Sequence, residues 1–211
     1  MKVRSVNIGE KRLVKWRGKE VPTGIFKYPI DKAIHLGKTD VVGDAVVDRR
    51  YHGGTDKACY IYSADHYEFW QTQYPDLEFQ DGIFGENITV EGLNEAQIQI
   101  GDIFYIGECR VQVRQPRQPC FKLGVRFGTQ KIVKNFINNP FPGVYVSVID
   151  EGTVKKGDQM RLSERLHDSI GLLEVWGLLY GTEPDQDLLE FAVNFQHLAE
   201  ECKASLRKRI K

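Results

Sequence analysis

The chain has 211 residues, which is enough for one good-sized domain or for a domain of about 150 residues with a small addition. Its composition, 41% hydrophobic and 27% charged, is typical of globular proteins, and it lacks the apolar run of about 18 residues that a membrane span requires. The 29 basic and 29 acidic residues balance, so the excess of positive charge expected of a nucleic-acid-binding domain is absent.

The N-terminal segment and the cysteines predict a cytoplasmic protein. The first residues contain no apolar signal-peptide core. The cysteines have neither C-x-x-C spacing nor a zinc-binding pattern, so we expect reduced thiols and no secretion. These cysteines are Cys59, Cys109, Cys120 and Cys202.

Short strand patterns separated by glycine, proline and charged residues predict strands over 3–8, 12–16 and 24–28. A glycine-rich loop follows and opens into an apolar strand over 58–62. Glycine has no side chain to keep a ligand away from backbone N–H groups, so the loop is a candidate binding site. Alternatively, it is a plain turn with a solvent-facing histidine. Candidate contacts in and beside this loop are Arg49, Arg50, His52, Gly53, Gly54 and Lys57.

The next segment predicts a helix over 64–74, capped by Ser63, and then a meander of strands over 97–100, 103–106 and 109–115. Asn87 lies between them in a polar turn, where its side chain either contacts a ligand or bonds the turn backbone. Residues expected in the core are Tyr67, Phe69, Trp70 and Tyr74 on the helix, and Cys109, Val111 and Val113 on one face of the last strand.

Cys120 is the residue around which we expect the site to be organised. Pro119 fixes the backbone before it, so the chain cannot be helical up to the cysteine. Arg114, Arg117 and Lys122 lie within six residues, and nearby cations favour the thiolate, which is a nucleophile or a soft metal ligand. The alternative is that Cys120 is a small buried hydrophobic residue.

Charge is segregated along the chain. Residues 58–108 contain ten acidic and no basic residues, whereas residues 109–149 contain seven Lys or Arg and no Asp or Glu. This pattern favours a small anionic ligand near the second segment, and the alternative is two solvated faces of opposite charge.

The remainder predicts a helix over 132–137 and strands over 144–149, 153–154 and 159–162. After residue 163 the pattern becomes helical, with helices over 169–180, from Pro184 onward, and over 195–210. Three such short helices are too small to be stable alone, so we expect them to pack on the larger domain.

Four motifs, in this order, resemble the MOSC family, which is named for the C-terminal domain of molybdenum cofactor sulfurases. The segment 171–211 resembles the helical addition found in stand-alone bacterial members. The resemblance implies a mainly β fold with α, in which a MOSC-type β-barrel over 1–165 precedes a three-helix domain over 166–211. The motifs are His52-Gly53-Gly54-x-Asp56-Lys57, Phe84-Gly85-Glu86-Asn87, Gly101-Asp102 and Pro116-Arg117-x-Pro119-Cys120.

The resemblance also implies a molybdenum pterin cofactor whose metal is bound by one cysteine, which here is Cys120. Its phosphate would be held by nearby cations, and His52 would contact an oxo group or the substrate. Among relatives that perform redox chemistry, N-hydroxylated compounds are reduced to amines, and the stand-alone bacterial branch is linked to detoxification of N-hydroxylated base analogues. The cations expected to hold the phosphate are Arg49, Arg50, Lys57, Arg114, Arg117 and Lys122.

We therefore expect a molybdenum-dependent reductase that acts as a monomer or homodimer on a small N-hydroxylated substrate. The chain has no flavin, haem or iron-sulfur pattern, so electrons must come from an external electron-donor protein. Two alternatives remain open: a cofactor or sulfur carrier without turnover, and a sulfur-transfer protein in which Cys120 is a nucleophile without metal. A family-level association with pyridoxal phosphate is also open.

Overall fold

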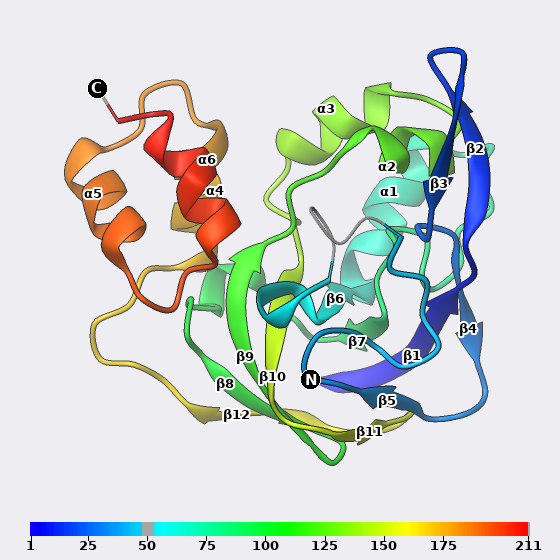
Figure 1. The fold of residues 1–211 in the computed structure, drawn as a ribbon, viewed down its shortest axis with the longest axis horizontal. Helices are drawn as coiled ribbons and strands as arrows, with labels where there is room; N and C mark the ends of the chain where they lie inside the picture. Colours follow the sequence, from blue (N-terminus) through cyan, green and yellow to red (C-terminus); the bar gives the residue numbers. More distant parts are fainter. Residues whose placement is uncertain (48–52, 211) are drawn as a thin grey trace.

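The computed structural model describes residues 1–47 and 53–210. One eight-stranded sheet dominates the fold, and two short two-stranded sheets accompany it (Figure 1). The strands in chain order are β1 (Lys2–Gly9), β2 (Arg12–Trp16), β3 (Lys19–Thr23), β4 (Lys27–Ile30), β5 (Ile34–Leu36), β6 (Cys59–Ser63), β7 (Ile88–Glu91), β8 (Ile103–Ile106), β9 (Cys109–Pro116), β10 (Val144–Asp150), β11 (Gly152–Val154) and β12 (Met160–Glu164).

The helices fall into two groups, one in the middle of the chain and one at its C-terminal end. Figure 1 shows α4, α5 and α6 together at one side of the sheet, whereas the β2–β3 hairpin extends at the opposite side. None of the described helices is both long and apolar enough to cross a bilayer. The α-helices are α1 (Tyr67–Gln73), α2 (Phe121–Arg126), α3 (Lys131–Ile137), α4 (Leu172–Tyr180), α5 (Gln186–Asn194) and α6 (Glu200–Arg207), and the 3-10 helices are η1 (Thr55–Lys57), η2 (Ala64–His66) and η3 (Glu95–Gln97).

The large sheet has the strand order β12-β8-β9-β10-β6-β7-β1-β4, and it does not close into the predicted barrel. All neighbouring strands are antiparallel except β6 and β7, which are parallel. Between the start of β1 and the residues around the start of β12, the structure has an isolated bridge of Lys2 with Gln159 and a few backbone hydrogen bonds, but no ladder. A barrel requires a continuous ladder between its first and last strands. The prediction of a β-barrel is therefore wrong, and the fold is a mixed α/β arrangement around one open sheet.

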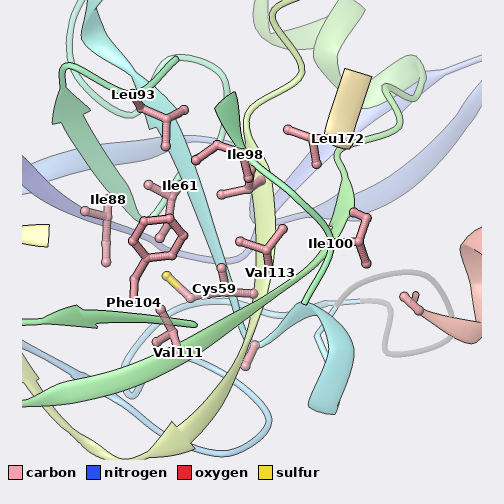
Figure 2. Packing of buried hydrophobic residues seen from close by; sticks show 14 of the residues in the cluster. Cys59, Ile61, Ile88, Leu93, Ile98, Ile100, Phe104, Val111, Val113 and Leu172 are labelled. Carbon is pink, nitrogen blue, oxygen red and sulfur yellow. The ribbon is translucent and has the colours of Figure 1, made fainter. Parts of the chain in front are cut away.

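The core extends from the sheet into the C-terminal helices. Figure 2 shows Cys59 and Ile61 of β6 beside Phe104 of β8 and Val111 of β9, with Leu172 of α4 in the same cluster. A side chain of α4 thus belongs to the core that the strands form, which confirms that the helices pack on the larger unit. The division at residue 165 stays a prediction.

A second, aromatic cluster lies between α1, α3 and the strand β6. Trp70 is fully buried and its Nε1 donates to the hydroxyl of Tyr62 at 2.8 Å. Phe84 and Phe136 pack on these rings. Tyr67 is buried as expected, whereas Phe69 is 38% exposed at the surface, so its assignment to the core was wrong.

Local structure departs from the sequence prediction in four further places. The strand expected over 24–28 begins only at Lys27, as β4. The expected strand over 97–100 is instead η3 followed by a turn, because the Asn94 side chain accepts from the N–H of Ala96 at 3.1 Å and starts a helical turn. The side chain of Ser63 caps no helix, and the first turn after it is 3-10. Finally, α2 follows directly after Cys120, where no helix was predicted.

Candidate functional site

A cavity between the sheet and α2 gathers six of the predicted site residues from segments that are distant in sequence. Its remaining walls come from the end of β3, the segment 44–47, the turn before β7, and tyrosines of β6 and β10. The predicted residues that line it are Gly53, Lys57, Asn87, Arg117, Cys120 and Lys122.

Cys120 enters this cavity from the segment that joins β9 to α2. Its backbone is extended, with φ of −130° and ψ of 174°, and it is the residue preceding the first turn of α2. Of the four cysteines, Cys120 alone is partly exposed. Burial raises the pKa of Cys109 and Cys202 to about 12, so these two thiols are inert at neutral pH.

Arg117 forms the most unusual feature of the cavity. The residue is only 5% exposed, its guanidinium lies 5.4 Å from the centre of the Tyr60 ring and 5.3 Å from that of Phe136, and its Nη1 has no hydrogen-bond partner. Burial by itself would lower the pKa of Arg117, but Tyr60, Tyr145 and Cys120 raise it. A buried donor without a partner costs about 1–3 kcal/mol. An anion entering the cavity would provide the missing acceptor.

Three functional candidates were missed by the sequence reasoning. Lys27 of β4 and Asp44 form an ion pair in the cavity wall, and both side chains are almost completely buried. Asp44 also accepts from the backbone N–H of Gly9 at 2.9 Å. Tyr145 of β10 lines the cavity, and burial raises the pKa of its phenol to about 12. The alternation of β10 could have placed Tyr145 on the face opposite Val144, but nothing local indicates the pairing of Lys27 with Asp44.

Asn87 lines the cavity and bonds residues outside its own turn, and its contact with a ligand stays a prediction. Its Nδ2 donates to Asp44 Oδ2 at 3.0 Å, and its Oδ1 accepts from the N–H of Tyr60 at 3.3 Å. The side chain therefore ties the turn before β7 to β6 and to the buried ion pair, and its amide faces the cavity from a fixed position.

The glycine loop is shaped by close backbone contacts. Gly53 has φ of +71°, and a Cβ there would lie 2.7 Å from Cγ1 of Val46, so a side chain is excluded at this wall of the cavity. Gly54 does not line the cavity, and its N–H donates to the Thr39 carbonyl at 2.9 Å. Three predicted contacts, Arg49, Arg50 and His52, lie outside the described residues.

Arg114 is not brought into the cavity. Its Nε donates to Asp56 Oδ1 at 2.9 Å, and its Nη1 donates to Gln112 Oε1 at 3.1 Å. The positive charge of Arg114 is thus compensated by an acidic side chain that follows the glycine loop.

The C-terminal helices reach the site at one point. The ammonium of Lys57, which lines the cavity, pairs with the carboxylate of Glu201 in α6, and the N–H of Ala199 donates to the Arg114 carbonyl at 3.1 Å. The C-terminal helices therefore contribute Glu201 beside the cavity.

The residues present fit a metal-bearing anion that is held through one thiolate. Cys120 supplies a soft ligand, while Arg117 and Lys122 supply buried positive charge, and the Nη1 of Arg117 lacks an acceptor. Within residues 1–47 and 53–210 there is no group of three or more His, Cys, Asp or Glu that could hold a metal ion alone.

Comparison with known proteins identifies the family. The model of the MOSC domain matches residues 48–161, which is more than half of the chain. The chain is 35% identical over 207 residues to the uncharacterized protein YflK of Bacillus subtilis, with 98% of this chain and 93% of YflK covered. It is also 32% identical over 176 residues to a protein named reductase from Gibberella moniliformis, with 82% of this chain but only 31% of that protein covered.

The fold gives the same result. The crystal structure of YiiM from Geobacillus stearothermophilus superimposes with a TM-score of 0.82 at 28% sequence identity, and the match covers 100% of this chain and 99% of YiiM. YiiM and this chain thus share one fold over their full lengths. On both sequence and structure, the chain belongs to the MOSC domain family.

Proposed function

We propose that this MOSC protein is a molybdenum-cofactor-dependent oxidoreductase that reduces N-hydroxylated compounds, such as N-hydroxylated base analogues, to amines. The observation that carries the proposal is the pairing of the partly exposed Cys120 thiol with the buried Arg117, whose Nη1 has no acceptor, in one cavity. The relative named reductase supports an oxidoreductase in general.

Each side chain of the cavity has a distinct role in this proposal. Cys120 would ligate the metal, and Arg117 and Lys122 would hold the phosphate of the pterin. When bound, the cofactor supplies the two-electron removal of oxygen from the N–OH group. Tyr145 keeps its phenol proton at neutral pH even at the ordinary tyrosine pKa of about 10, and burial raises that pKa to about 12, so its hydroxyl can donate a hydrogen bond to the substrate oxygen.

The reaction balances as R–NHOH plus two electrons and two protons giving R–NH₂ and water. The electrons come from an external donor protein. The chain covers only 31% of the length of the relative named reductase.

The test uses protein purified from a host that makes the cofactor. Molybdenum, pterin and the reduction of an N-hydroxylated purine with a chemical electron donor are measured for the wild type, Cys120→Ser and the buried control Cys59→Ser. We expect metal, pterin and turnover in the wild type, no turnover in Cys120→Ser, and normal turnover in Cys59→Ser. Cofactor-loaded wild-type protein without turnover would show a carrier, and full turnover in Cys120→Ser would refute the assignment of the thiol.

A further inference from the structure

Two arginines converge on one tyrosine beside the cavity. The guanidinium carbon of Arg12, on β2, lies 5.1 Å from the ring centre of Phe26 and 5.2 Å from that of Tyr28. The corresponding distances for Arg126, on α2, are 5.1 Å and 5.0 Å. Nη1 of Arg12 and Nη1 of Arg126 both donate to the Tyr28 hydroxyl oxygen, at 3.3 and 3.1 Å. We call Arg12, Phe26, Tyr28 and Arg126 the arginine cluster.

The positive charge of the arginine cluster is not compensated. Among residues 1–47 and 53–210, no ion pair joins Arg12 or Arg126 to a carboxylate, and Nε of Arg126 is buried without a hydrogen-bond partner. Burial would raise the pKa of Tyr28, but the hydrogen bond and charge of Arg126, with those of Arg12, lower it. Both arginines therefore act on the same phenol oxygen, and their donors face a position where an anion could accept from them.

The arginine cluster borders the cavity without lining it. Arg12 pairs across the β2–β3 hairpin with Thr23, which is a lining residue. Arg126 lies four residues after Lys122 on the same face of α2, and Lys122 also lines the cavity. Phe26 lies in sequence between Ile25 and Lys27, which both line the cavity. The arginine cluster is therefore adjacent to the cavity that contains Cys120.

We propose that the arginine cluster is a phosphomonoester subsite, which binds the phosphate of a nucleotide substrate while the N-hydroxylated base enters the cavity. This proposal rests on the proposed reduction of N-hydroxylated compounds. Planar guanidinium groups form paired hydrogen bonds to phosphate oxygens, and two of them converge here. The pterin phosphate has the same chemistry, but Arg117 and Lys122 already offer it cations inside the cavity, and no residue of the cluster lines that space.

The subsite is tested by calorimetric binding of adenosine 5′-monophosphate and adenosine to cofactor-loaded protein. We expect the monophosphate to bind at least about tenfold more tightly, as charge-assisted hydrogen bonds to phosphate require. Arg12→Gln, and Arg12→Gln with Arg126→Gln, should bring the two affinities within about threefold of each other. Arg17→Gln is the matched control, because its guanidinium lies on the same hairpin, 5.5 Å from the Trp16 ring, and does not bond Tyr28.

Three outcomes would overturn the proposal. Equal affinities in the wild type would show that there is no phosphate subsite, and an unchanged preference in the double variant would place it elsewhere. Loss of pterin and molybdenum from the arginine variants would assign the cluster to the cofactor. Arg12 is exposed, so the single variant decides the matter if the double variant does not fold. A wild type that prefers the monophosphate but fails to reduce N-hydroxylated purines would refute the proposed reaction and leave the subsite standing.

Discussion

Replacing Arg117 by methionine should separate the stability of the fold from the binding of the cofactor. The substitution removes a buried charge while keeping an unbranched, apolar side chain in its place. Two effects on the free energy of unfolding then oppose each other. Loss of the contacts with Tyr60 and Phe136 costs about 0.5–1 kcal/mol for each ring, whereas removal of the unpartnered Nη1 recovers about 1–3 kcal/mol.

These terms nearly cancel, so we expect the unfolding free energy of cofactor-free Arg117→Met to change by less than about 1 kcal/mol. For a chain of this length that corresponds to a shift in Tm of about 2–4 °C at most. Cofactor retention should fall much further, by about 10- to 100-fold, because charge-assisted hydrogen bonds to the phosphate are lost. Arg117→Glu should abolish retention, since it places a like charge opposite the phosphate.

The assay combines calorimetric melting of cofactor-free protein with molybdenum and pterin analysis of protein from a cofactor-producing host. Lys155→Met, which removes an exposed positive charge away from the cavity, serves as the control and should retain cofactor normally. If Arg117→Met were destabilised by more than about 3 kcal/mol and still carried normal cofactor, Arg117 would be a structural cation, and the reasoning from its missing acceptor would be refuted.

Three further predictions concern thiols, pH and the C-terminal helices. Cys120→Ser should lose turnover at an unchanged melting temperature, whereas Cys59→Ser and Cys109→Ser should lose about 1–3 kcal/mol of stability and keep a normal metal content. Burial raises the pKa of the Glu86 carboxyl, so above about pH 4.3 the folded protein keeps a proton that the unfolded chain releases. The stability that this group contributes is fully present below the unfolded pKa of about 4.3, and it is lost as the pH rises toward the folded pKa. In urea titrations across pH, the unfolding free energy of Glu86→Gln relative to the wild type should therefore rise by up to about 1.4 kcal/mol per pH unit in that window. A difference in unfolding free energy that stays constant with pH would contradict the burial argument. Deletion of residues 166–211 should expose the core covered by α4 and cause aggregation, which light scattering measures, and a soluble truncated protein with normal cofactor content would contradict the shared core.

Many features of the chain could be predicted from its sequence because they depend on neighbouring residues. Alternation in β9 placed Cys109 in the core, since successive side chains of a strand point to opposite faces. Pro119 ensured an extended approach to Cys120 because its ring restricts the backbone. The basic stretch around Cys120 predicted an anion site; the structure places Arg117 and Lys122 in the cavity, and the anion itself stays a prediction.

Tertiary structure decided everything that depends on partners distant in the chain. The open sheet depends on β1 pairing with β4 and β7, and no local pattern states which strand pairs with which. No feature of the sequence separates the roles of Arg114 and Arg117. In the structure Arg114 pairs with Asp56 outside the cavity, whereas Arg117 is buried in the cavity and its Nη1 has no acceptor. The arginine cluster, too, exists only because a hairpin and a helix meet over Tyr28. The sequence thus determined which residue types were available and to which face of a strand their side chains point. Only the folded chain determined which charged side chains are left without a partner, because burial and pairing are properties of the whole fold.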